Sequence, residues 1–233
     1  MIEVDQIDTY GWKAAIRGMR NPMNSWGKSD SLFNGNRTVT IGKIKYCASE
    51  LQIIGPNDLD LMQRLFKAGT EHRKYLRMIH VTMDIVAPLY WWKEFDTYKV
   101  GTVENSCSTM HKISAKEFTV DDFSYEHLFS LGTLRMVIDD LNDNRAMYLG
   151  TKNKNYWWQM IQLLPSSYNQ RRTVDFDYET VFSMIRQRTG HKLDEWNNFI
   201  DILKDLPYVR EISGDAYGPL YKFLTKDEDK NET

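Results

Sequence analysis

A polar run at residues 102–112, TVENSCSTMHK, gathers hydroxyl, amide, thiol and imidazole groups in one short segment. Within it, Cys107 and His111 are four residues apart, and a thiol becomes a nucleophile where a neighbouring group lowers its pKa. Cys107 is therefore a candidate nucleophile, with His111 as the nearby imidazole. The commoner role of such a cysteine is that of a small polar residue, and both interpretations stay open.

Other residues with chemical potential give weaker patterns. His72 and His80 are eight residues apart, which matches no recognised metal-ligand spacing, so no metal site is predicted. Four carboxylates in the middle of the chain are formal candidates for acid–base chemistry, but the sequence assigns that role to none of them: Asp84, Glu94, Asp96 and Glu104. The pairs Trp91-Trp92 and Trp157-Trp158 can stack on a flat ring, although packing in a core or interface is their commoner use.

Length and composition favour one large domain. The chain has 233 residues, 42% of them hydrophobic, and we predict a domain over residues 1–225 followed by a charged tail at 226–233. The net charge of −2, without a basic stripe, argues against a nucleic-acid polymer as partner. Only two cysteines are present, outside any CxxC or metal spacing, and we expect two free thiols.

Targeting signals are not evident in the sequence. The first ten residues, MIEVDQIDTY, contain acids where a signal peptide needs a basic stretch, and no apolar run approaches the ~20 residues that span a bilayer. We therefore expect no membrane partner and a cytoplasmic location, in the host cell cytoplasm if the protein is virus-encoded.

The elements that must position these groups are mostly helical. Apolar periodicity, caps and breakers predict helices at 12–20, from 57 or 58 to 69, at 124–141, 145–164, 177–188 and 193–206. Alternation predicts a half-buried strand at 79–85, and Pro88 then begins a helix that ends near Val100-Gly101. The turn-rich segment at 21–38 is predicted to be an ordered loop at the rim of a pocket.

The order of these pieces resembles that of the flavin-dependent thymidylate synthases of the ThyX family. The similar segments are Ala15–Arg20 (an Ala-x-Arg-x-x-Arg helix), Leu65–Gly69, Ala87-Pro88, Lys93–Phe95, Leu164-Pro165 and Ile185–Arg188. Together they cover roughly residues 14 to 200. The resemblance implies an α+β fold with a central, mostly antiparallel sheet flanked by helices, assembled as a homotetramer.

The resemblance also implies where ligands bind, although it assigns no catalytic residue. The positions carried over for a nucleotide are Glu94, Lys99, Asn105, Ser106, Cys107, Ser108 and Arg188. Those carried over for a flavin are Thr97, Tyr98, Lys99, Asp177 and Ser183. FAD is the implied cofactor, while NADPH and methylenetetrahydrofolate are implied only if the protein is catalytically active.

Most positions that carry the family's chemistry hold other residues here. Thr97, Tyr98 and Lys99 stand at the family's Arg-His-Arg, while Glu94, Asn105 and Cys107 stand at its Gln, Glu and Ser. Two further family arginines are replaced by Thr109 and Ile161. Arginine binds phosphate bidentately, and each charge-assisted hydrogen bond contributes about 1.5 to 3 kcal/mol, so these losses weaken phosphate binding. The basic residues that could compensate are Lys99, Lys112, Arg171 and Arg172.

Three hypotheses follow. The first is a divergent flavin-dependent enzyme that methylates a pyrimidine nucleotide, of the dUMP to dTMP type. The second is a non-catalytic protein that binds a nucleotide or other small ligand on the ThyX scaffold, and the third is a protein that keeps only the fold. For the first two, we expect the pocket between residues 94–111 and the helix that carries Arg188, completed by a neighbouring subunit.

Overall fold

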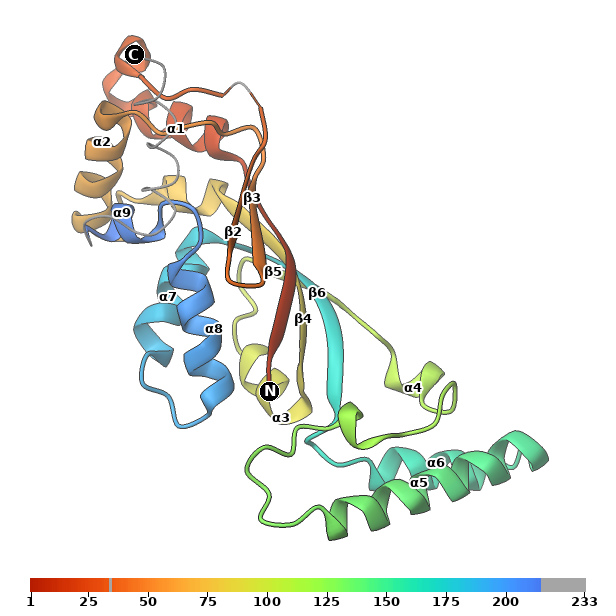
Figure 1. The fold of residues 1–233 in the computed structure, drawn as a ribbon. Coiled ribbons are helices and arrows are strands. Elements are labelled where there is room, and N and C mark those ends of the chain that lie inside the picture. The colour runs from red at the N-terminus through yellow and green to blue at the C-terminus, as the bar shows by residue number, and fades with distance from the viewer. Residues whose placement is uncertain (34, 215–233) are drawn as a thin grey trace, which may run out of the picture. The chain divides into compact units, whose positions relative to one another are not determined.

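The computed structural model describes residues 1–33 and 35–214. The chain is a mixed α+β protein. Six strands form one mostly antiparallel sheet in the order β2-β3-β1-β4-β6-β5, with helices flanking it (Figure 1). The predicted α+β class is therefore confirmed. The predicted tail, 226–233, lies outside the described residues. No helix in the described part of the chain is long and apolar enough to span a membrane.

The chain divides into two compact units. Unit 1 contains Met1–Glu3, Ile85–Thr97 and Glu104–Thr173, and unit 2 contains Val4–Asp84, Tyr98–Val103 and the described residues from Val174 onward. Three of the unit boundaries fall within strands β4 (His80–Pro88), β5 (Thr102–Ser106) and β6 (Asn169–Asp177). That residues 1–225 form a single domain stays a prediction.

Three further strands belong largely to unit 2: β1 (Glu3–Tyr10), β2 (Arg37–Ile41) and β3 (Ile44–Ala48). Strand β3 pairs parallel with β1 and antiparallel with β2, and Gly42, at φ +61°, supplies the left-handed conformation that the β2–β3 turn requires. In β3, Tyr46 and Ala48 are buried, whereas Lys45 is exposed and Cys47 is half-buried. One face of this part of the sheet therefore faces the core and the other is polar.

Unit 2 also holds most of the aromatic core. Its helices are α1 (Trp12–Arg20), α2 (Pro56–Lys67), α7 (Tyr178–Arg188), α8 (Asp194–Lys204) and α9 (Val209–Ser213), with 3-10 turns η1 (Asn21–Met23), η2 (Trp26–Lys28) and η3 (Lys74–Met78). The ring of Trp12 packs edge-on against Tyr178 and Tyr208, all three buried. Helices α7 and α8 lie side by side (Figure 1). This packing fixes the end of α7, where Arg188 lies.

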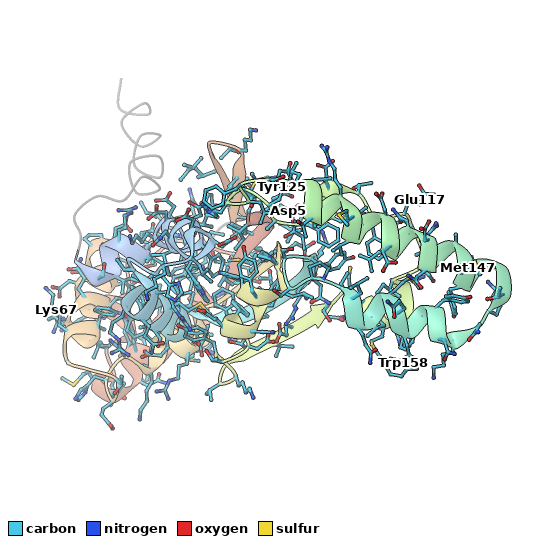
Figure 2. The ribbon with its side chains drawn as sticks, turned by 90° about the horizontal axis from the view of Figure 1, so that it is seen from below. Asp5, Lys67, Glu117, Tyr125, Met147 and Trp158 are labelled. Atoms are coloured by element: carbon cyan, nitrogen blue, oxygen red, sulfur yellow. The ribbon has the colours of Figure 1, made fainter. Side chains whose placement is uncertain are left out.

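Unit 1 is built on a helical hairpin. Its helices are α3 (Leu89–Phe95), α4 (Thr109–Lys112), α5 (Gly132–Thr151) and α6 (Lys154–Leu163), with a 3-10 turn η4 (Val120–Asp122). Helices α5 and α6 pack along each other; Figure 2 labels Met147 on the first and Trp158 on the second. Leu141 and Met160 are fully buried between them, in a cluster that also takes in Phe118.

Several predicted helix boundaries were wrong. The helix predicted at 124–141 begins at Gly132 and continues as α5 to Thr151, where Lys152 adopts a left-handed conformation at φ +58°. The helix predicted from residue 145 begins at Lys154 as α6. Asn153 then caps α6 by accepting a hydrogen bond from the backbone of Asn155. Helix α3 ends at Phe95 instead of near residue 100, because the Thr97 hydroxyl binds the carbonyl oxygen of Glu94 and closes the last turn.

The predicted ordered loop after α1 is anchored by buried charges. Arg20 Nε donates to Asp58 Oδ1 at 2.6 Å, and the other carboxylate oxygen accepts from the hydroxyls of Ser29 and Ser31. The Asp30 carboxylate in turn accepts from the first backbone N–H groups of α2. The prediction that Asn57 or Asp58 caps α2 was therefore wrong. The capping carboxylate comes from Asp30 in the loop, so the loop and the helix hold each other in place.

Candidate functional site

Arg188 is the last residue of α7 and lies in a small cluster within unit 2. Its Nε donates to the hydroxyl of Tyr98 at 3.1 Å, and Nη1 lies 3.2 Å from Nε2 of His191. The guanidinium also lies over the ring of Trp196, 4.8 Å from its centre, and 5.7 Å from the centre of the Tyr98 ring. The side chain is only partly exposed. The arginine to which the resemblance assigns a nucleotide contact is therefore oriented by three neighbouring side chains.

This arrangement suits an anion-binding role. Arginine stays charged at any physiological pH, and contact with aromatic faces orients its planar fork. The Tyr98 hydroxyl accepts a hydrogen bond from Arg188 and donates one to Oε1 of Gln187 at 3.0 Å, so it acts as both acceptor and donor. Tyr98 stands where the family has histidine, and here it supports the guanidinium directly.

Two residues carried over as flavin contacts take part in bonds within α7. Asp177 is the N-cap, and its carboxylate accepts from the backbone N–H of Thr180 at 2.8 Å. Gly101, at φ +78°, lies so close that a Cβ there would be 2.8 Å from this carboxylate. Ser183 Oγ accepts from the side chain of Gln187 at 3.1 Å. Both side chains thus have local structural bonds.

The polar run of unit 1 forms β5, a turn and α4. Asn105, Ser106 and Cys107 are exposed. The backbone of Cys107 is bonded on both sides, its N–H to the carbonyl of Arg171 and its carbonyl to Nε2 of Gln170. Ser108 caps α4 by accepting from the backbone N–H of His111 at 3.2 Å. Part of this polar run therefore builds the turn itself.

Arg172 was a candidate to replace a lost phosphate contact, and its charge is already paired. Its Nη1 lies 2.7 Å from Asp96 Oδ1 and 2.6 Å from Glu104 Oε2, within unit 1. The guanidinium lies 4.3 Å from the centre of the Trp92 ring. Two carboxylates around one guanidinium leave a net negative charge, which disfavours phosphate binding at Arg172.

The remaining predicted positions have simpler surroundings. Ile161 stands at a family arginine and packs against the core cluster of the α5–α6 hairpin. Glu94 is half-buried on α3, and Thr97 closes that helix. Lys99, Lys112 and Arg171 are exposed. Trp91 and Trp92 are fully buried, as packing predicts, whereas Trp158 remains partly exposed beside Lys154.

Sequence reasoning missed a polar cluster across β1, β4 and β6 of unit 2. The Asp175 carboxylate accepts from the hydroxyl of Tyr10 and lies 2.9 Å from Nδ1 of His80, whose ring stacks on that of Tyr10. Partial burial, followed by the bond to Asp175, raises the pKa of Tyr10 to about 12. Alternation had placed His80 on the polar side of its strand, but the strand that carries Asp175 was not predicted.

Comparisons with known proteins identify the fold. No protein-family model and no curated protein matches the sequence. Solved structures do match: ThyX from Helicobacter pylori with FAD and dUMP has a TM-score of 0.66 at 14% identity, covering 91% of this chain and 97% of that chain. The UMP/dUMP methylase PolB from Streptomyces cacaoi, bound with 5-Br dUMP, has a TM-score of 0.57 at 11% identity, covering 94% and 96%.

These matches span nearly the whole chain at very low identity. They confirm the fold inferred from the order of sequence segments, an α+β fold with a central, mostly antiparallel sheet flanked by helices. A fold of this kind accommodates different site chemistry, so function must be argued from the residues. The chain has the ThyX fold.

Proposed function

We propose that this protein binds a pyrimidine nucleotide on the ThyX scaffold, with Arg188 as the contact for its anionic group. The observation that carries the proposal is the orientation of this guanidinium by Tyr98 and Trp196. Such a side chain loses little further conformational freedom when an anion binds. Lys99, exposed and adjacent to Tyr98 in unit 2, is the proposed second cation.

We expect the nucleotide to bind more weakly here than in a site with a full set of arginines. Arg172 is neutralised by two carboxylates, and Ile161 belongs to a hydrophobic cluster. Few strong phosphate contacts remain, and each is worth about 1.5 to 3 kcal/mol. A role in nucleotide binding for the predicted residues Glu94, Asn105, Ser106, Cys107 and Ser108 stays a prediction.

Flavin-dependent methylation of a pyrimidine nucleotide is the second candidate. It is supported by the structural neighbours, which include a ThyX with FAD and dUMP and a UMP/dUMP methylase. Reduced flavin would supply the hydride for such a reaction. Because Asp177 and Ser183 have local bonds within α7, flavin contacts would fall mainly to residues 97–99.

Two measurements on the purified protein test these proposals separately. Calorimetric titration with dUMP and UMP, and with deoxyuridine as the control without phosphate, tests nucleotide binding. We expect both nucleotides to bind more tightly than deoxyuridine; equal or undetectable binding of all three overturns the first proposal. The visible absorbance spectrum, before and after addition of FAD, tests the second. Protein that neither contains nor binds flavin contradicts flavin-dependent methylation but leaves nucleotide binding intact.

A further inference from the structure

A depression of about 390 Å³ lies over β1 and the β2–β3 hairpin, entirely within unit 2. Pockets for small molecules commonly have volumes of ~300 to 1,000 Å³, so one small ligand fits. The lining residues are Asp5, Gln6, Ile7, Asp8, Thr38, Lys43, Ile44, Lys45 and Cys47. None of them belongs to the Arg188 cluster, so this depression is a separate candidate site.

Strand register explains why these side chains meet. Asp8 on β1 and Thr38 on β2 both pair with Cys47 of β3, which places Cys47 in the middle row. The Thr38 hydroxyl donates to the Cys47 sulfur at 3.9 Å. Because Tyr46 and Ala48 face the core, Lys45 and Cys47 project from the opposite, polar face.

The charges in the depression are divided between two neighbouring strands. Asp5 and Asp8 come from β1, whereas Lys43 and Lys45 come from β3 and the turn before it. The Asp8 carboxylate is held in place by Ser49, whose hydroxyl donates to it at 2.7 Å and whose backbone N–H donates at 3.2 Å. Two carboxylates and two ammonium groups give a formally neutral site, with the acidic groups on one strand and the basic groups on or just before its neighbour.

This charge division selects among ligand classes. A simple anion would be attracted by the lysines and repelled by the carboxylates, and a simple cation would experience the reverse. A zwitterion satisfies both sets of charges through charge-assisted hydrogen bonds. Because Asp8 pairs with Cys47, Lys45 lies two residues along the neighbouring strand, roughly 8 Å from Asp8 between Cα atoms, a span that a small amino acid with one hydrogen bond of about 2.8 Å at each end can bridge. We propose that the depression binds a free amino acid, with its ammonium toward Asp8 and its carboxylate toward Lys45.

Cys47 provides a built-in reporter for the test. The thiol is half-buried in the depression, while Cys107 is an exposed free thiol outside it. The rate of alkylation by neutral iodoacetamide is measured at each cysteine by peptide mass spectrometry, with glycine or γ-aminobutyrate as the zwitterion. Sodium acetate and ethylammonium chloride, at equal concentration, supply each half of the zwitterion alone.

We expect each zwitterion to lower the alkylation rate of Cys47 by a factor of one plus the ratio of its concentration to its Kd. At a concentration of ten times Kd, the rate should therefore fall about tenfold. The rate at Cys107 should not change. Lys45→Gln should remove the protection, and Lys13→Gln, at an exposed position on α1, should retain it. No protection by either zwitterion, or equal protection by acetate or ethylammonium, overturns the proposal.

Discussion

Arg188 and Tyr98 form a hydrogen bond of 3.1 Å from the guanidinium Nε to the phenol oxygen, although 90 residues separate them in sequence. The bond joins the end of α7 to the segment that follows α3, within unit 2. It gives the retained arginine a defined direction, which makes its contribution to ligand binding measurable by substitution.

The first prediction concerns the charge of Arg188. Arg188→Ala should weaken binding of dUMP or UMP by about 1.5 to 3 kcal/mol, roughly 10- to 150-fold in Kd, because one charge-assisted contact is lost. Titration calorimetry measures this directly. Arg186→Ala, at an exposed position on the same helix, is the matched control and should leave Kd unchanged. An unaltered Kd in Arg188→Ala would show that the family role was carried over wrongly.

The second prediction concerns wild-type affinity. Thr97, Thr109 and Ile161 replace family arginines, and Ile161 packs in a hydrophobic cluster. We therefore expect dUMP to bind with a Kd weaker than micromolar, measured by calorimetric titration. Micromolar or tighter binding would mean that other cations of the protein compensate fully.

The third prediction concerns the buried pair Arg20–Asp58. Both side chains are almost inaccessible, and removing one partner of such a pair leaves an uncompensated charge. Asp58→Ala should lower the free energy of unfolding by about 3 to 5 kcal/mol. Asp60→Ala breaks the pair with Arg64, whose side chains are 64% and 66% exposed, and should cost less than about 1 kcal/mol. Urea unfolding measures both, and similar costs would contradict the buried-pair argument.

The same carboxylate gives a pH dependence. Burial by itself raises the pKa of Asp58, but the hydrogen bonds that it accepts outweigh burial and hold this pKa below its usual value. Because the pKa of Asp58 is lower in the folded protein than its value of about 3.9 in the unfolded chain, the ionised carboxylate stabilises the fold above about pH 3.9. This stabilisation is lost as the pH falls through the pKa of Asp58 in the folded protein. Asp58→Asn should therefore show a smaller loss of stability below about pH 4 than wild type.

The elements differ in how well the sequence alone predicts them. Helix α1 and the end of α7 were predicted correctly, and the start of α7 to within one residue, because local sequence signals decide them. The cap of α2 was missed because it comes from Asp30, 26 residues earlier than Pro56. Strand β6 was missed because its pattern, NQRRTVDFD, has polar residues on most positions and becomes a strand through its neighbours in the sheet.

The candidate site likewise combines features that local sequence predicts with features that depend on distant contacts. Local signals placed Arg188 at the end of its helix, and the family resemblance suggested its ligand role. Its partners Trp196 and His191 come from the next helix and turn, which no local pattern indicates. The pairing of Arg172 with Asp96 and Glu104 likewise depends on contacts over more than 60 residues. Sequence could nominate Arg172 as a free cation, whereas only the structure reveals its neutralisation.

The last prediction concerns Tyr10 and Asp175. Partial burial and the neighbouring carboxylate disfavour the phenolate and raise the pKa of Tyr10 to about 12. The raised pKa stabilises the fold below the unfolded pKa of about 10, and this contribution is lost as pH rises from 10 towards 12.

Subtracting the ultraviolet titration curve of Tyr10→Phe from that of wild type isolates the titration of the Tyr10 phenol. Asp175→Asn removes the negative charge and should move the titration of Tyr10 towards lower pH. The difference spectrum must be compared below the pH at which circular dichroism detects unfolding. If Tyr10 titrates near pH 10 in wild type, the hydroxyl is not bonded to Asp175 in solution, and the orientation of His80 by the same carboxylate would lose its support.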